Sequence, residues 1–292
     1  MDANDFLITR QEHYELANLA RKIEASASLT SGAPVGSDLQ LILECNNIIL
    51  LNYPIERSGS NSFSAIFSQS KVGTQVFSFI GINTYDYYDK QIFAIAHELY
   101  HFSAQNKPHI SRDGTPSTSE ERKAEYFAAE LLLPLDILCS TIMSEFHKSD
   151  ISDIPLSAKL RFIARLHCKW WLPYKAIVKR LYEAEALTPS AFDELYAIDE
   201  RNETGTYYRI GLSTNSSYFT LLNTITKQIG TSAANLEDAI RNFDDDHTSA
   251  DELIKGLQLF GLKPADFGID LEAGVPADEW AAFRAGGHSD EG

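Results

Sequence analysis

Apolar residues recur at helical spacing along two segments of the chain. In IFAIAHELYHF the apolar stripe consists of Ile92, Ile95, Ala96, Leu99 and Phe102. In STSEERKAEYFAAELLLP it consists of Ala124, Phe127, Ala128, Leu131 and Leu132. A repeat of three and four residues predicts an amphipathic helix with one face in a core. The polar stretch between them, residues 106–119, is typical of a loop, so the chain is expected to return on a second helix.

Strand patterns precede the first of these helices. NIILLNY, FSAIF and TQVFSFIGIN are rich in β-branched and aromatic residues and are separated by a polar run of serine and glycine. We expect a small antiparallel sheet against which the first helix packs. The segment Val76–Asn83 is our candidate for an edge strand that takes a substrate backbone as an added strand, and an ordinary core strand is the alternative.

The remaining pattern is mainly helical. The further predicted helices are Gln11–Ala27, Asp38–Cys45, Leu135–His147, Leu156–His167, Pro173–Glu185, one from Thr188, Tyr218–Ile229, Ala233–Phe243 and Ser249–Phe260. TYYRIGL, near residue 206, is predicted to be a strand. These patterns give an α+β fold and two domains, residues 1–200 and a mainly helical extension over residues 201–292.

Composition narrows the class of protein. The chain has 292 residues, of which 44% are hydrophobic and 23% charged. No apolar run approaches the ~20 residues of a membrane span, and no charged segment precedes an apolar one at the start. Three scattered cysteines, Cys45, Cys139 and Cys168, suit reduced thiols, so we expect a cytoplasmic protein without a membrane partner.

The net charge of −16 argues against a broad nucleic-acid-binding surface, so we expect no direct nucleic-acid partner. It would suit a basic protein partner, although solubility alone also explains it.

The first helix carries the pattern H-E-x-x-H as His97, Glu98 and His101. Two histidines four residues apart lie on one helix face and can bind one metal ion. Glu98 flanks that face, where it could hold a water molecule and take its proton as general base. The alternative is an ordinary pair of histidines on a half-buried helix, so a third ligand decides between them.

Glu121 is the preferred third ligand, because it stands three residues before Ala124 at the head of the second apolar stripe. Two histidines and one glutamate, with an open position for water, are a ligand set of catalytic zinc. Glu120 competes, but Ser117 and Glu120 fit a capping box at the helix start. Glu125 could accept a hydrogen bond from a metal-bound histidine.

HELYHF followed by ERKAEYFAAELLLP resembles the ImmA/IrrE family of zinc metallopeptidases, whose pattern is roughly HELGH, then E-x-x-A-N-x-F-A-x-x-L-L-x-P. The similarity extends weakly over Leu39 to Leu187. Tyr100 replaces the glycine before the second histidine, and Glu125 replaces the asparagine. The resemblance implies a zincin-like domain with Zn²⁺ held by His97, His101 and Glu121, and Glu98 as catalytic base.

The resemblance also implies a substrate, since family members commonly cut a helix-turn-helix transcriptional repressor. The alternative function is a zinc-dependent regulatory protein that docks a partner without cutting it. His109, in the loop, could steady an oxyanion, and Asp244 to His247 could hold a second metal. Solvated side chains are the plainer interpretation of both features.

Overall fold

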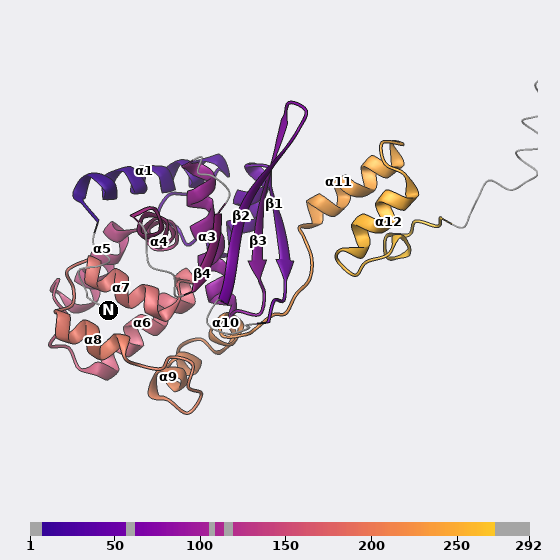
Figure 1. The fold of residues 1–292 in the computed structure, drawn as a ribbon. Coiled ribbons are helices and arrows are strands. Elements are labelled where there is room, and N and C mark those ends of the chain that lie inside the picture. Colours follow the sequence, from indigo (N-terminus) through magenta and orange to yellow (C-terminus); the bar gives the residue numbers. More distant parts are fainter. Residues whose placement is uncertain (1–7, 57–61, 105–108, 114–118, 272–292) are drawn as a thin grey trace, which may run out of the picture. The chain divides into compact units, whose positions relative to one another are not determined.

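The computed structural model describes residues 8–56, 62–104, 109–113 and 119–271. The chain divides into two compact units, Met1–Ser232 and Ala233–Gly292. Figure 1 shows the elements of each unit along the chain. The division falls after the boundary expected at residue 200, because two further helices pack into the first unit. The α+β fold class is confirmed.

The sheet of the first unit has four strands in the order β1-β3-β2-β4. They are β1 (Ile48–Tyr53), β2 (Ser62–Val72), β3 (Gln75–Asn83) and β4 (His109–Asp113). β2 pairs antiparallel with β3 and β4, whereas β1 pairs parallel with β3. The expectation of a wholly antiparallel sheet was therefore wrong, because β2 and β3 form a hairpin and β1 joins the far side of β3. Residues 76–83 lie in this central strand, so their interpretation as an edge was also wrong.

One face of the sheet supports the helix with the two histidines. Alternate residues of three strands are buried on this face, namely Ile48, Leu50, Ala65, Phe67, Ile80 and Ile82. This alternation is the period of two expected for a strand with one buried face. Helix α3 (Tyr88–Ser103) lies next to the sheet in Figure 1, and the ring of Phe102 meets that of Phe67 edge-on with centroids 6.2 Å apart.

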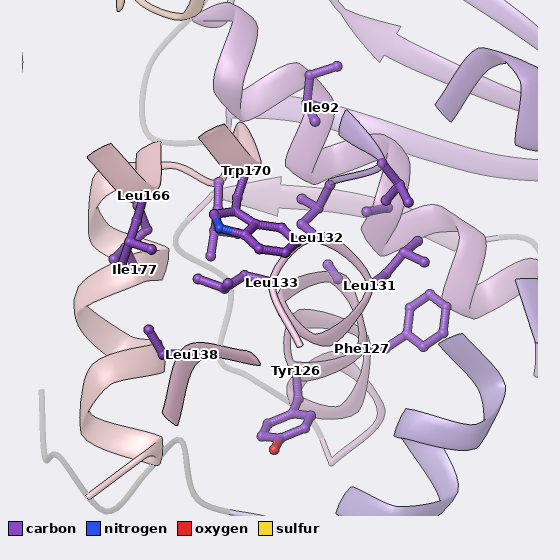
Figure 2. Close-up of a cluster of buried hydrophobic side chains, with 14 of the residues drawn as sticks. Ile92, Tyr126, Phe127, Leu131, Leu132, Leu133, Leu138, Leu166, Trp170 and Ile177 are labelled. Carbon is purple, nitrogen blue, oxygen red and sulfur yellow. The ribbon is translucent and has the colours of Figure 1, made fainter. Parts of the chain in front are cut away.

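The other helices build a core around α4 (Ser119–Leu132). Figure 2 shows Phe127, Leu131 and Leu132 of α4 gathered with Leu133 and Trp170. Helices α1 (Arg10–Ser26) and α7 (Tyr174–Glu183) pack on α4. The other helices of this part of the chain are η2 (Gly36–Asp38), α2 (Leu39–Cys45), α5 (Leu135–Phe146), α6 (Leu156–Trp170) and α8 (Pro189–Tyr196). Pro189 is the first residue of α8 and Thr188 caps it, as the sequence predicts.

The segment TYYRIGL is helical and not a strand. It belongs to α9 (Thr206–Thr214), which is followed by α10 (Ser216–Leu222). Tyr207 and Gly211 lie one helical turn apart and are both buried. A Cβ atom on Gly211 would lie 2.0 Å from Cε2 of Phe219, so the glycine allows the two helices to approach. Tertiary packing thus overrides the strand preference of the aromatic residues.

The second unit is a short helical hairpin. It contains α11 (Ala233–Asp244), α12 (Ala250–Gln258) and η3 (Pro264–Phe267). Ser249 and Glu252 form a capping box at the start of α12, which buries Leu253 and Leu257. In the described part of the chain, no single helix is long and apolar enough to cross a membrane. The pair α4 and α5, bent by 54°, passes that test together by length and composition.

Candidate metal centre

Helix α3 places His97 and His101 side by side. Their Nε2 atoms lie 3.3 Å apart, and their side chains are almost entirely buried. A spacing of four residues puts both rings on one face of the helix, one turn apart. When neither Nε2 carries a proton, both ring nitrogens direct lone pairs into the space between the two rings. This pair is therefore suited to share one cation.

Helix α4 adds a carboxylate to the histidine pair. The two oxygens of Glu121 lie 3.3 Å from Nε2 of His97 and 3.4 Å from Nε2 of His101. Packing of α4 on α3, with the rings of Phe127 and Tyr100 5.9 Å apart, brings Glu121 to this position. The apolar stripe that Glu121 heads is the feature of the sequence that places it.

The three donor groups fit a tetrahedral metal ion. All three ligand atoms lie within 4.8 Å of one another. Tetrahedral zinc with bonds of about 2.0–2.1 Å separates its ligand atoms by about 3.3 Å. The two ring nitrogens lie 3.3 Å apart, which matches that edge length, and each lies 3.3 or 3.4 Å from a different oxygen of Glu121. Two imidazoles and one carboxylate leave the fourth position open, which is typical of a catalytic zinc site.

Negative charge surrounds His97. Burial alone would lower the pKa of His97, but the hydrogen bond with Glu121 raises it, and the charges of Glu98, Glu121 and Glu125 add to this, so the pKa is raised overall. The same field that favours a proton on the ring also favours a divalent cation. Metal and protons therefore compete for this site.

Glu98 is fully buried beside the histidine pair. Its charge acts on His97, its neighbour on α3. A carboxylate held in this way can accept a proton from a water molecule placed between the ligands. Glu98 is therefore the candidate for the general base that the sequence pattern indicates.

Glu120 has a separate structural contact. It accepts a hydrogen bond from the hydroxyl of Tyr100 (2.8 Å), and Lys123 Nζ lies 3.2 Å away. The group of possible metal ligands contains Glu121 and not Glu120. Tyr100, which stands where the family has glycine, thus ties α3 to the start of α4. Ser117, the expected cap partner of Glu120, lies outside the described residues.

No other candidate residue belongs to the donor group among the described side chains. The carboxylate of Glu125 is 3.0 Å from Lys179 Nζ on α7, so its hydrogen bond goes to a lysine and not to a histidine ring. His109 begins β4, where its side chain is outside the described residues. Asp244 and Asp246, at the turn after α11, are exposed and belong to no group of metal-ligating side chains among the described residues.

Two buried polar residues that sequence reasoning missed support the helix. Asn83 ends β3 and bonds three backbone segments: its amide donates to the carbonyls of Ile55 (2.9 Å) and Phe63 (2.8 Å), and its oxygen accepts from Tyr85 N (3.0 Å). Asp89, in the first turn of α3, binds Arg201 through both carboxylate oxygens. The position of Asn83 at a strand end is a signal in the sequence that could have identified its role. Asp89 gives no such signal, because its partner Arg201 lies 112 residues away.

Comparison with known proteins agrees with this geometry. Residues 59–181 match the model of the peptidase M78 family that is described as the IrrE N-terminal-like domain. The matched segment contains His97, Glu98, His101 and Glu121. No curated protein and no solved structure gave a match. The resemblance to the ImmA/IrrE family is thus confirmed over residues 59–181.

Proposed function

We propose that this protein is a zinc-dependent endopeptidase that hydrolyses a peptide bond in a specific protein partner. The observation that carries the proposal is the convergence of His97, His101 and Glu121, each of which places one possible ligand atom within 4.8 Å of the other two. The match of residues 59–181 to a peptidase family supports the reaction class. Two nitrogen donors and one carboxylate suit zinc among the divalent ions.

His97, His101 and Glu121 would hold the ion, which supplies Lewis-acid activation of a water molecule and of the scissile carbonyl. Glu98 takes the proton from that water as it attacks, then passes the proton to the leaving amine. Burial of Glu98 keeps bulk water from competing for the proton. The packing of α4 on α3 holds Glu121 in place, so the ligand set is arranged before substrate arrives.

The sheet offers a place for the substrate backbone. Within the described sheet, β4 is an edge strand that pairs with β2 on one side. It follows α3 in the chain and is separated from it by few residues. An extended peptide could add to this edge through main-chain hydrogen bonds. We therefore assign to β4 the role that the sequence pattern suggested for β3.

The proposed substrate is a DNA-binding repressor with a basic face. The family resemblance supplies most of this inference, and charge adds to it. The whole chain has a net charge of −16. Residues 233–292, with fourteen acidic and four basic residues, supply much of this negative charge. An acidic surface steers a basic partner toward it, and salt weakens this attraction.

The test is incubation of the zinc-loaded protein with DNA-binding proteins encoded beside it, followed by intact-mass measurement. The Glu98→Gln variant is the matched control, since it keeps the ligands and removes the base. We expect two fragments from one partner with the unaltered chain and none with Glu98→Gln. A chain that ends at Ser232 should cut the same bond more slowly.

Two results would contradict the proposal. Sequence-tolerant digestion of unfolded casein would indicate a general peptidase. Release of the genes that the repressor silences, if it persists with Glu98→Gln and without any fragment of a partner, would indicate a protein that docks without cutting.

A further inference from the structure

An extended segment after α10 runs along the connection between β3 and α3. Residues 224–230, which we call the strap, bond this connection at several points. Tyr88 N donates to Thr224 O (2.9 Å), Lys227 N donates to Thr84 O (2.9 Å), and the hydroxyl of Thr84 donates to Gln228 O (2.8 Å). These bonds fix both ends of the turn that leads into α3.

The strap also contacts a side chain of α3 itself. Gln91 is 5% exposed, and its amide nitrogen donates to Thr226 Oγ1 (3.1 Å) and to Asp86 O (2.8 Å). At its far end the strap pairs with β1, where Asn52 and Gly230 exchange two backbone hydrogen bonds of 2.8 and 3.1 Å. The strap therefore connects the helix to the outer strand of the sheet.

Arg201 holds the same end of α3 from another side. Its Nη2 donates to both oxygens of Asp89 at 2.8 and 2.7 Å, and its Cζ lies 4.2 Å from the ring centroid of Tyr87. His167 Nε2 lies 3.1 Å from the same carboxylate. Asp89 is fully buried. Hydrogen bonds between charged groups of this kind are short and directional.

Most contacts at the other end of α3 are apolar. There, Tyr100 and Phe102 pack against the rings of Phe127 and Phe67, and the Tyr100 hydroxyl adds one hydrogen bond to Glu120. Apolar contacts are not directional, so they resist separation of the helix from its neighbours more than rotation about its axis. The directional contacts near the start of α3 come from His167, Arg201 and the strap, and the last two lie outside residues 59–181.

We propose that Arg201 and the strap position the metal helix, fixing its rotation so that His97 and His101 face Glu121; this inference rests on the proposed metal centre. A rotation of about 10° moves an atom about 6 Å from the helix axis by about 1 Å. Metal–ligand distances tolerate only about 0.2 Å. A small rotation of α3, allowed when the contacts at its start are lost, would therefore move the histidines out of metal-binding distance.

The test is metal affinity in the full-length chain, measured by competition with a zinc chelator at a temperature where circular dichroism shows every variant folded. Thr226→Val removes only the contact between the strap and Gln91, whereas Gln91→Leu removes this contact together with the bond to Asp86 O. Thr226→Ser keeps the hydroxyl and serves as the conservative variant. Phe192→Leu, on α8, is the control for a general loss of stability, because its ring packs on Tyr182 and Tyr196.

We expect Gln91→Leu to weaken zinc affinity by about tenfold or more, a loss of the size seen when groups that orient ligands are removed. Thr226→Val should weaken it in the same direction. Thr226→Ser and Phe192→Leu should stay within about twofold of the unaltered chain, even where melting temperature falls as far as in Gln91→Leu.

Equal affinity in Gln91→Leu, Thr226→Val and Phe192→Leu would overturn the positioning role and leave the metal centre standing. An unaltered chain that binds no zinc would overturn both. The two failures are therefore distinguishable in one titration series.

Discussion

The carboxylate of Glu121 lies 3.3 Å from Nε2 of His97, which joins the second ligand helix to the first. The neighbouring carboxylate, Glu120, instead accepts a hydrogen bond from Tyr100. Two adjacent residues of the same type thus have different partners, since successive residues of a helix point in different directions. Replacing each carboxylate in turn should therefore affect metal binding and stability differently.

Glu121→Ala should abolish tight zinc binding, whereas Glu120→Ala should keep it. Loss of the Tyr100 hydrogen bond in Glu120→Ala is expected to lower the free energy of unfolding by about 1 kcal/mol. Zinc titration and urea unfolding of both variants measure the two effects. The opposite ranking in the titration would place the ligand one residue earlier.

Glu98→Gln should retain zinc and lose hydrolysis. The amide keeps the size of the side chain but cannot accept a proton, so the rate of cleavage should fall by about 10²–10⁴-fold. Zinc content and cleavage rate, measured on the same preparation, test this separation. Loss of zinc together with activity would assign Glu98 to the ligands.

Asp89→Asn should destabilise the protein in a way that depends on pH. Burial alone would raise the pKa of Asp89, but the hydrogen bond with His167 and the charge of Arg201 outweigh it, so the pKa is lowered. A lowered pKa in the folded state adds stability above the pKa of the unfolded state, about 4, and that stability is lost as pH falls through the folded value.

The stability difference between the unaltered chain and Asp89→Asn should therefore be about 3 kcal/mol near neutral pH and smaller at about pH 3. Urea midpoints at a series of pH values measure it. A difference that grows as the pH falls would contradict the assignment of the lowered pKa to this carboxylate.

Gly211→Ala should destabilise the first unit, because the new methyl group would meet the ring of Phe219. Overpacking of this kind typically costs about 1–3 kcal/mol. Gly256→Ala, on α12, has open space around its Cβ and is the matched control. Thermal unfolding of the two variants measures the contrast. Equal melting temperatures would mean that α9 and α10 do not pack as described.

The two metal helices were predictable because their signals are local. The spacing of His97 and His101 and the apolar stripe that Glu121 heads need only the helical period to be interpreted. Strand order was not predictable in the same way. The sequence of β1 does not say whether it joins β2 or β3, since that choice depends on which edge the helices leave open. The prediction of an antiparallel pairing failed for this reason.

The contacts that hold the start of α3 also could not be predicted from the sequence. Asp89 and Arg201 are separated by 112 residues, and nothing near either residue indicates the other. The aromatic residues of α9 favoured a strand, but packing of α9 against α6 and α10, with Phe219 close to Gly211, overrides that preference. Interactions between distant segments decided both cases.

The most direct test of the metal centre is native mass measurement of the zinc-loaded chain beside His101→Ala. His101 supplies one of the three donor atoms, and its removal leaves two ligands, too few for a tight site. We predict one zinc ion per unaltered chain and none in His101→Ala, with both proteins folded by circular dichroism. An unchanged zinc content in His101→Ala would contradict the account.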